Sequence, residues 1–370
     1  MLQGEQKAKL EASSADTLFP ILQPALTGIA RLASQAPHTD DGHLIEFHAL
    51  AARSILNKSI SRRQLSLAYS INPYRGCEFA CRYCYARYTH EFLTPPSTLP
   101  PISPDPTQPQ PWATAFEHTI YLKQNAAWLL EQELRKIDPV EEIALGTATD
   151  PYQPIERRAR ITRSLLEVFA RRSGYRLSIV TKSTLILRDI DLLTRIAQRN
   201  TLVLHLTITT PDAQLARLLE PRAPRPDLRF DAVRQLRQAG LTTGILCSPL
   251  LPGITDTTAA VDRMAARAAA ANASFFSAQP LFLKSCSRPT YLRFVSEHFP
   301  TLLPLYEDHF RTSDFAQDPY RSRIRALVLD ACRRHQIPTR STDALLTRET
   351  HPLKKLPPSS EPPAQRRLFA

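Results

Sequence analysis

The chain has 370 residues, 43% of them apolar, which is enough to bury one large hydrophobic core or two smaller ones. No apolar run approaches the ~20 residues of a bilayer-spanning helix, so we expect neither a secretory leader nor a membrane segment and place the chain in the cytoplasm. Its 47 Lys and Arg exceed its 35 Asp and Glu, and the net charge of +12 favours anionic partners, nucleic acid among them.

Four segments follow one another along the chain. Residues 1–60 show no sustained hydrophobic period and are predicted to be an N-terminal extension. Residues 61–290 form the predicted core, residues 291–352 are predicted to be a helical part, and the proline-rich residues 353–370 have the composition of a disordered tail. Residues 95–111 contain eight prolines in seventeen positions, which excludes a regular helix and predicts a long extended loop.

The core is predicted to be an α/β fold built on a parallel sheet. Short runs rich in β-branched and aromatic residues predict strands near residues 67–72, 141–148, 176–182, 202–209, 242–248 and 273–282. Helical periodicity predicts helices at residues 119–136, 160–172, 188–199, 226–239 and 257–271. Because crossover segments separate the strands, we expect six parallel strands in one sheet.

Three cysteines follow the first predicted strand. Cys77, Cys81 and Cys84 have the spacing C-x3-C-x2-C, and three thiolates at this spacing can ligate three irons of one [4Fe–4S] cluster. The next cysteine is Cys247, so we expect the fourth iron to take a ligand that is not a protein side chain. Tyr83 lies directly before the last of the three, where its ring can meet a stacked base.

The sequence leaves other uses of the three cysteines open. A structural zinc ion would need a fourth ligand, and His90, six residues beyond Cys84, could supply it in a site of three cysteines and one histidine. A disulfide network is disfavoured because three clustered cysteines cannot all pair. An iron–sulfur electron carrier would use the same ligands but would need no cosubstrate pocket and only a modest chain length.

The cysteine motif resembles that of the radical S-adenosylmethionine (SAM) superfamily, in which the amine and carboxylate of SAM chelate the open iron. The resemblance implies that the six-stranded sheet curls into a partial (β/α)6 TIM-like barrel with N- and C-terminal extensions. It also implies that a reduced cluster, given one electron by an external reductant, cleaves SAM to methionine and a 5′-deoxyadenosyl radical that abstracts hydrogen from the substrate.

Ligand sites in parallel α/β sheets lie beyond the C-terminal ends of the strands, and this rule selects further cofactor-binding residues. They are Gly146, Thr149 and Asp150 after the second strand, Lys182 and Ser183 after the third, and Thr207 and Thr209 at the end of the fourth. Glycine lets the backbone approach a ligand, Thr149 or Asp150 can bind an amine, the lysine can bind a carboxylate, and the later threonines suit a ribose. Structural interpretations stay open, because threonine is an ordinary strand residue and Asp150 before a proline can start a turn.

A narrower resemblance spans residues 70–254, about half of the chain. Residues 70–77, 146–156, 179–183, 219–224 and 249–254 are similar to segments of spore photoproduct lyase-like proteins, also described as DNA repair photolyase-like. The resemblance implies that Cys77, Cys81 and Cys84 ligate the cluster, that the region of Tyr83 contacts SAM, and that Lys182 binds its carboxylate.

The lyase resemblance also suggests that one cysteine returns a hydrogen atom to a product radical. Cys247, at the end of the fifth strand, and Cys286, after the sixth, are the two tentative catalytic residues, although an isolated intracellular thiol is more often structural. Cys332 lies in an arginine-rich helical segment and is expected to be inert. Arg222 is expected either to bind a carboxylate or to pair with Glu220.

Basic charge is concentrated in residues 156–172, which contain six arginines, Arg157 and Arg158 among them. These arginines are expected to form solvated helix faces or, if they share one face, to contact nucleic-acid phosphates. We therefore predict a radical SAM enzyme of lyase type that acts on an anionic substrate, with nucleic acid as a class to be tested. The alternative is a zinc- or iron–sulfur-containing nucleic-acid-binding module without catalysis.

Overall fold

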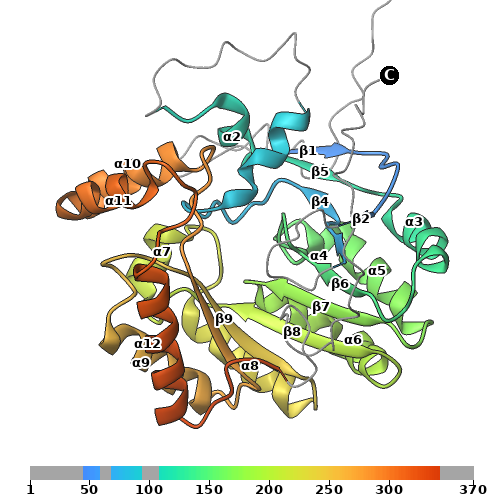
Figure 1. The fold of residues 1–370 in the computed structure, drawn as a ribbon. Helices are drawn as coiled ribbons and strands as arrows, with labels where there is room; N and C mark the ends of the chain where they lie inside the picture. The colour runs from blue at the N-terminus through green and yellow to red at the C-terminus, as the bar shows by residue number, and fades with distance from the viewer. Residues whose placement is uncertain (1–44, 59–67, 94–107, 342–370) are drawn as a thin grey trace, which may run out of the picture. The chain divides into compact units, whose positions relative to one another are not determined.

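The computed structural model describes residues 45–58, 68–93 and 108–341 (Figure 1). Residues 1–44, most of the proline-rich loop predicted at 95–111, and the tail predicted at 353–370 lie outside the described residues. The predicted domain boundaries stay predictions. Within the three described ranges, no helix combines the length and the apolar character that crossing a membrane requires.

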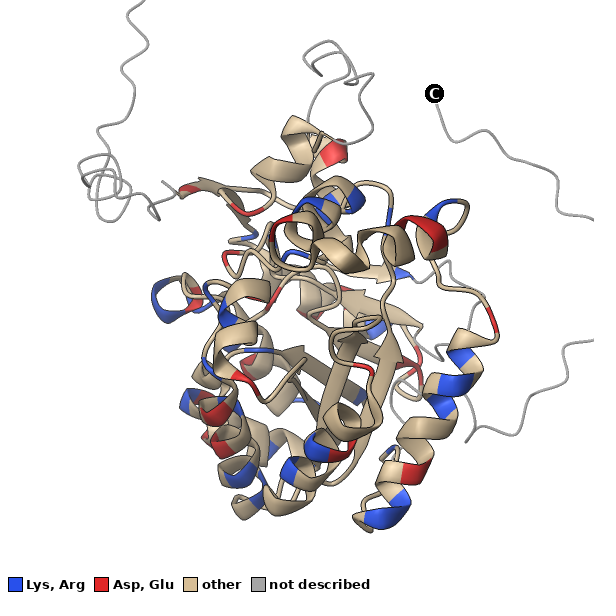
Figure 2. Cartoon of the chain, turned by 90° about the vertical axis from the view of Figure 1, so that its left-hand side faces the viewer, with Lys and Arg blue, Asp and Glu red and all other residues tan. Residues whose placement is uncertain are grey.

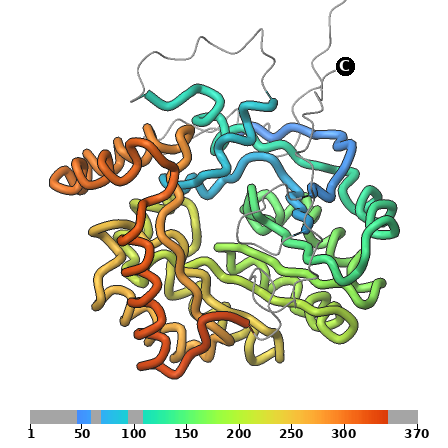
Figure 3. The backbone as a smooth tube through the Cα atoms, in the orientation of Figure 1, coloured from blue at the N-terminus to red at the C-terminus, as the bar shows by residue number. Residues whose placement is uncertain are grey.

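A seven-stranded sheet forms the centre of the described chain. Six of its strands are parallel and lie side by side in chain order: β3 (Tyr69–Ile71), β6 (Glu142–Leu145), β7 (Arg176–Thr181), β8 (Thr201–Thr207), β9 (Thr243–Leu250) and β10 (Phe276–Pro280). The edge strand β2 (Leu56–Lys58) pairs antiparallel with β3. Figure 3 shows this order as a progression of colour across the sheet. The predicted partial (β/α)6 fold is confirmed, and all six predicted strands are present.

Helices connect the successive strands and cover the sheet (Figure 1). They are α4 (Glu156–Ala159), α5 (Ile161–Ala170), α6 (Ile190–Ala197), α7 (Ala213–Leu219), α8 (Pro226–Gln238) and α9 (Thr258–Ala270). At the start of α9, the Thr257 hydroxyl accepts a hydrogen bond from Ala260 N at 3.2 Å. Gly240, with a φ of +79°, follows the end of α8. The apolar faces of these helices, with Leu165 and Phe169 of α5 as examples, pack with the strands in the main hydrophobic core.

The sequence does not predict the second sheet, which contains β1 (Glu46–Ala49), β5 (Thr119–Leu122) and β4 (Tyr74–Arg75) in that order. β5 occupies the beginning of the helix predicted at 119–136, so that prediction is wrong there. Only α3 (Ala126–Glu133) and the short 3-10 helix η2 (Leu134–Lys136) are helical in this range. β5 consists of β-branched, aromatic and leucine side chains and pairs with β1 and β4 on its two sides, and this pairing outweighs the helical periodicity.

The described chain ends in helices α10 (Arg288–His298), η4 (Pro300–Leu302), α11 (Leu303–Phe310) and α12 (Tyr320–Arg334). α12 packs on α9 and β10, and its Ile324 and Val328 enter the main core. By contrast, Tyr291 of α10 and Tyr306 of α11 belong to a second core that also contains Cys77. Helices α10 and α11 therefore share a hydrophobic core with the cysteine motif.

Candidate active site

The three cysteines of the motif lie on one loop between β4 and the 3-10 helix η1 (Tyr85–Leu93). Cys77 and Cys81 are buried, with 9% and 7% of their surfaces exposed, and Cys84 is half-buried. Gly76 begins the loop with a φ of +87°, and a Cβ atom there would lie 2.8 Å from Thr119 O. Only glycine fits this conformation and this close approach of two backbone segments.

The three thiols of this loop could hold an iron–sulfur cluster. All three cysteines are free. Burial raises the pKa of Cys77 well above its ordinary value, and the charges of Asp150, Cys81 and Cys84 raise it further. Burial also raises the pKa of Cys81 to about 12, although Lys182 opposes this. Thiolates at these two buried positions are therefore unfavourable without a cationic partner, and the irons of a cluster would supply one.

The zinc alternative depends on His90 as the fourth ligand. His90 Nε2 lies 2.9 Å from Thr119 O, and the imidazole packs against the rings of Phe116 and Tyr121. In the part of the chain that the structure describes, no three His, Cys, Asp or Glu side chains are arranged to hold one metal ion. The cysteines of a [4Fe–4S] cluster bind different irons and need not converge on one point.

The loop between β6 and α4 is hydrogen-bonded to the cysteine loop. Thr149 Oγ1 donates to Gly76 O at 2.5 Å, and Gln153 Nε2 donates to Thr149 Oγ1 at 3.1 Å. Glu78 N donates to Gln153 Oε1 at 2.8 Å, and Ile155 N donates to Glu78 Oε1 at 2.7 Å. Gln153 and Glu78 are absent from the site predicted by sequence, although each lies close along the chain to a predicted site residue.

A buried arginine, which the sequence does not reveal either, supports the other side of the cysteine loop. Arg87 forms an ion pair of 2.6 Å with Glu117. Its Nη2 atom also donates to Cys81 O at 3.2 Å, and its Nη1 atom donates to Ala113 O at 2.9 Å. Arg87 therefore fixes the backbone at the second cysteine of the motif.

Asp150 joins the loops that follow β6 and β7. Its Oδ1 atom accepts hydrogen bonds from Tyr152 N at 2.9 Å and Thr181 Oγ1 at 2.6 Å, and its Oδ2 atom accepts from Lys182 N at 2.8 Å. The bond from Tyr152 N is the turn interaction expected of an aspartate before proline. Both carboxylate oxygens are thus bonded within the protein.

Lys182 and Tyr83 lie together beside the cysteine loop. The Lys182 ammonium is 5.7 Å from the centroid of the Tyr83 ring. Burial lowers the pKa of Lys182, but interaction with Cys81 and with the Glu220 carboxylate outweighs burial, so the net pKa is raised above its ordinary value. The Tyr83 hydroxyl bonds to Thr209 Oγ1 at 3.0 Å and donates to Glu220 Oε1.

Of the two roles expected for Arg222, the pairing with Glu220 is not present in the structure. Arg222 Nη1 donates to two backbone carbonyls, Glu78 O at 3.3 Å and Glu117 O at 3.1 Å. Glu220 pairs instead with Arg229 of α8 at 2.6 Å. Arg229 stands nine positions after Glu220 in an arginine-rich helix, so no local spacing distinguishes it from its neighbours.

Three other predicted residues have structural roles. At Gly146, which has a φ of +92°, a Cβ atom would lie 2.5 Å from Val180 O. Ser183 Oγ caps the 3-10 helix η3 (Thr184–Asp189) by accepting from Leu185 N at 3.2 Å. Thr207 is buried, and its carbonyl accepts from Arg229 Nη1 at 3.1 Å.

The two tentative catalytic cysteines lie in different surroundings. Cys247 is fully buried, with its sulfur 3.6 Å from Thr209 O. The sulfur of Cys286 lies 3.8 Å from Tyr85 O, beside the cysteine loop, and the adjacent Ser287 hydroxyl donates to Cys84 O at 2.6 Å. Cys332 is buried in α12, with its sulfur 3.7 Å from Phe276 O.

The arginines of residues 156–172 separate into two groups. Arg157 and Arg158 of α4 are exposed, and neither forms an ion pair with another described residue. Arg163 pairs with Asp189 at 2.6 Å and with Asp191 at 3.1 Å. Figure 2 shows Lys and Arg spread over many helices and interleaved with Asp and Glu. Arg157 and Arg158 belong to the helix that directly follows the β6–α4 loop.

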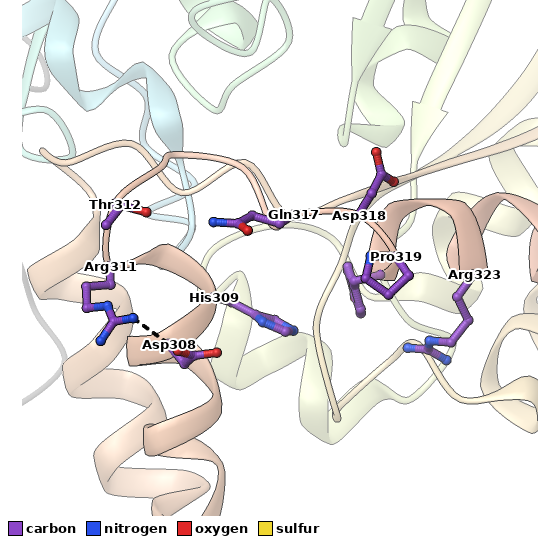
Figure 4. A pocket seen from close by; sticks show the side chains of 9 residues that line it. Asp308, His309, Arg311, Thr312, Gln317, Asp318, Pro319 and Arg323 are labelled. Carbon is purple, nitrogen blue, oxygen red and sulfur yellow. Dashed lines mark ion pairs between the residues drawn. The ribbon is translucent and has the colours of Figure 1, made fainter.

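A cavity of about 500 Å³ lies between α11, α12 and their connection (Figure 4). Its lining includes His309, Arg311, Asp318 and Arg323, with both charges present. None of the predicted site residues lines it. The predicted residues gather instead at the C-terminal edge of the sheet, after β3, β6, β7 and β8.

The chain matches the radical SAM superfamily over residues 71–264. It is 32% identical over 315 residues to an uncharacterised protein of Mycobacterium tuberculosis, covering 84% of this chain and 87% of that protein. An uncharacterised protein of Methanocaldococcus jannaschii is 30% identical over 188 residues, 51% of this chain and 62% of that protein. A spore photoproduct lyase double mutant, solved with bound AdoMet (SAM) and dinucleoside spore photoproduct, has the same fold, with a TM-score of 0.56. The two sequences are 15% identical, and the match covers 78% of this chain and 79% of that one.

Proposed function

Because the chain belongs to the radical SAM superfamily, we propose that it is an enzyme that binds a [4Fe–4S] cluster, cleaves SAM reductively and abstracts hydrogen from a substrate. The observation that carries this proposal is the cysteine loop, where three free thiols share one segment held by the β6–α4 loop. We assign Cys77, Cys81 and Cys84 as the cluster ligands. When bound and reduced by an external donor, the cluster would supply the electron that cleaves a C–S bond of SAM.

In this proposal the chain's own residues bind and orient SAM. The protonated Lys182 binds the SAM carboxylate through a charge-assisted hydrogen bond, and Asp150 fixes its backbone. Tyr83, whose hydroxyl is held by Thr209, offers an aromatic surface beside the cluster. Because Thr149 and Asp150 bond to other groups of the protein, we propose that they position the two loops rather than contact SAM. Contacts to SAM from Gly146, Ser183, Thr207, Thr209 and Arg222 stay predictions.

We propose a cysteine as the group that returns hydrogen to the product in a lyase-type reaction. Cys286 is the first thiol to test, because its sulfur lies near Tyr85 O and the adjacent Ser287 hydroxyl donates to Cys84 O. Cys247 is the second, and its complete burial below Thr209 makes direct contact with a substrate harder.

Nucleic acid is the substrate class that we propose. The chain carries a net charge of +12, and the unpaired Arg157 and Arg158 follow the loop that holds the cysteine motif. The spore photoproduct lyase that shares the fold was solved with a dinucleoside bound, which supports testing nucleic acid first.

The proposal is tested by anaerobic reconstitution. We expect bound iron and acid-labile sulfide, and 5′-deoxyadenosine formation that depends on SAM and dithionite. Cys77→Ala, Cys81→Ala and Cys84→Ala should each lose the cluster and the product, because each removes one iron ligand. Cys332→Ala, which changes a buried cysteine of α12, should keep both. Zinc without sulfide, a cluster without SAM cleavage, or full cleavage by a motif variant would each contradict the proposal.

A further inference from the structure

A fully buried ion pair lies next to the cysteine loop. Glu220 and Arg229 are each 1% exposed, and Arg229 Nη1 is 2.6 Å from Glu220 Oε2. Arg229 also donates to Pro224 O at 2.6 Å and to Thr207 O at 3.1 Å. Burying two charges costs desolvation free energy, and their mutual attraction often does no more than offset this cost. A contribution to stability is therefore a weak explanation for the presence of this pair.

The pair contacts the part of the motif between the second and third cysteines. Arg82 N donates to Leu219 O at 2.9 Å, which joins the backbone of the cysteine loop to the residue before Glu220. The Tyr83 hydroxyl donates to Glu220 Oε1, and Thr209 Oγ1 donates to the same oxygen at 2.9 Å. Glu220 is therefore hydrogen-bonded directly to Tyr83, the residue that precedes Cys84.

Three charged side chains, Lys182, Glu220 and Arg229, lie around the Tyr83–Glu220 hydrogen bond. The Lys182 ammonium lies 5.7 Å from the centroid of the Tyr83 ring. The Glu220 carboxylate bonds to the Tyr83 hydroxyl and to the Arg229 guanidinium. Charges act strongly on one another where water is excluded. The reduction potential of an iron–sulfur cluster depends on the net charge, hydrogen bonding and solvent access around it.

We propose that Glu220 and Arg229 are positioning residues that hold Tyr83, and that their opposite charges shift the reduction potential of the cluster bound by the cysteine loop in opposite directions and so offset each other. This inference rests on the proposed function, because it requires a cluster at Cys77, Cys81 and Cys84. Glu220 makes the surroundings more negative and opposes addition of an electron, whereas Arg229 favours it. As a pair the two leave little net charge beside the cluster.

The experiment is a redox titration of the reconstituted full-length protein without SAM, followed by electron paramagnetic resonance. Glu220→Gln should shift the midpoint potential to more positive values, because a negative charge is lost. Arg229→Gln should shift it to more negative values, and the double variant should return toward the wild-type value. The matched control is Glu142→Gln. Glu142 is the first residue of β6, at the opposite end of the sheet, and its buried carboxylate also pairs with an arginine. Its midpoint should stay at the wild-type value.

The outcomes separate the inference from the function on which it rests. Opposite shifts in the two single variants support the inference, since general loosening of the fold would shift both in one direction. Shifts of the same sign, or no larger than that of Glu142→Gln, overturn it. If neither single variant holds a cluster, recovery in the double variant supports charge balance, and failure of all three overturns it. Absence of a cluster from the wild-type protein would instead refute the proposed function.

Discussion

At the scale of single residues, Lys182 is the side chain whose role in binding SAM is most directly testable. Its ammonium is held beside Tyr83, and its backbone is fixed by Asp150. Lys182→Ala should weaken SAM binding by about 1.5–3 kcal/mol, the contribution of a hydrogen bond to a charged group. This corresponds to a roughly 10- to 150-fold higher dissociation constant. Calorimetry on the reconstituted protein measures it.

Two checks accompany this variant. The iron and sulfide content of Lys182→Ala should match that of the wild type, because the lysine is not a cluster ligand in our proposal. Lys136→Ala, at an exposed position of η2, should leave the affinity for SAM unchanged. An unaltered dissociation constant for Lys182→Ala would rule out the carboxylate contact.

A second residue, His205 of β8, makes the stability of the fold depend on pH. The ring is buried against Phe275, and in the described chain neither ring nitrogen has a hydrogen-bond partner. Burial lowers the pKa of His205 to about 4, whereas an unperturbed histidine titrates near 6.5. The folded state therefore favours the neutral ring. Its contribution to stability is complete above pH 6.5 and is lost as the pH falls toward 4.

Replacing the ring should remove this dependence. Between pH 7 and pH 5 the wild type should lose about 2 kcal/mol of unfolding free energy through His205, and His205→Phe should lose that much less. Urea unfolding at the two pH values measures the difference. His298→Phe, at an exposed position of α10, should behave as the wild type does. Equal acid sensitivity of His205→Phe and the wild type would show that another group is responsible.

At the scale of elements, the junction after β6 depends on a glycine. A Cβ atom at Gly146 would lie 2.5 Å from Val180 O of β7 and 2.6 Å from Pro151 Cδ, at a φ of +92°. Gly146→Ala should therefore combine left-handed strain with overpacking and cost about 2–5 kcal/mol. Gly240→Ala after α8 has a similar φ of +79° but no atom within 4 Å, so it should cost only about 1–2 kcal/mol. Urea unfolding compares the two, and equal losses would refute the close-approach argument.

Whether an element can be predicted from the sequence depends on what stabilises it. The six parallel strands carry apolar, β-branched runs because helices cover the sheet, and these runs are visible in the sequence. β5 is different, because Thr119–Leu122 becomes a strand through its pairing with β1 and β4. The order of residues along the chain does not reveal which segments pair in this way. The helix predicted at 119–136 fails for this reason.

At the scale of the whole molecule, the same distinction separates the predicted from the unpredicted parts of the site. The cysteine motif is local, so its spacing alone predicts a cluster-binding loop. Contacts between distant segments are not local: Gln153 meets Glu78 across 75 positions, and Cys286 meets Tyr85 across 201. The pairing of Glu220 with Arg229 rather than Arg222 depends on where α8 packs, and only the folded chain shows it.

The net charge of +12 leads to the last prediction, which concerns the binding of nucleic acid. Lys and Arg are spread over many helices, so net charge alone does not define a binding face (Figure 2). Arg157 and Arg158 are exposed, lack ion pairs within the described ranges, and belong to the helix that follows the loop bonded to the cysteine motif. If they neutralise phosphates, the logarithm of the binding constant should fall linearly with the logarithm of salt concentration, by about 0.9 per phosphate on duplex DNA.

The double variant Arg157→Gln/Arg158→Gln should then reduce that slope by about one or two units, because each lost arginine leaves one phosphate with its counterion. Cleavage of SAM should be unchanged, since neither arginine lies among the residues that we assign to SAM. Arg325→Gln/Arg333→Gln removes the same charge from exposed positions of α12 and should leave the slope as it is in the wild type. Fluorescence anisotropy from about 50 mM salt upward measures all three proteins. An equal fall in slope for both double variants would show non-specific attraction by net charge, and an unchanged slope for the α4 variant would exclude α4 from the binding face.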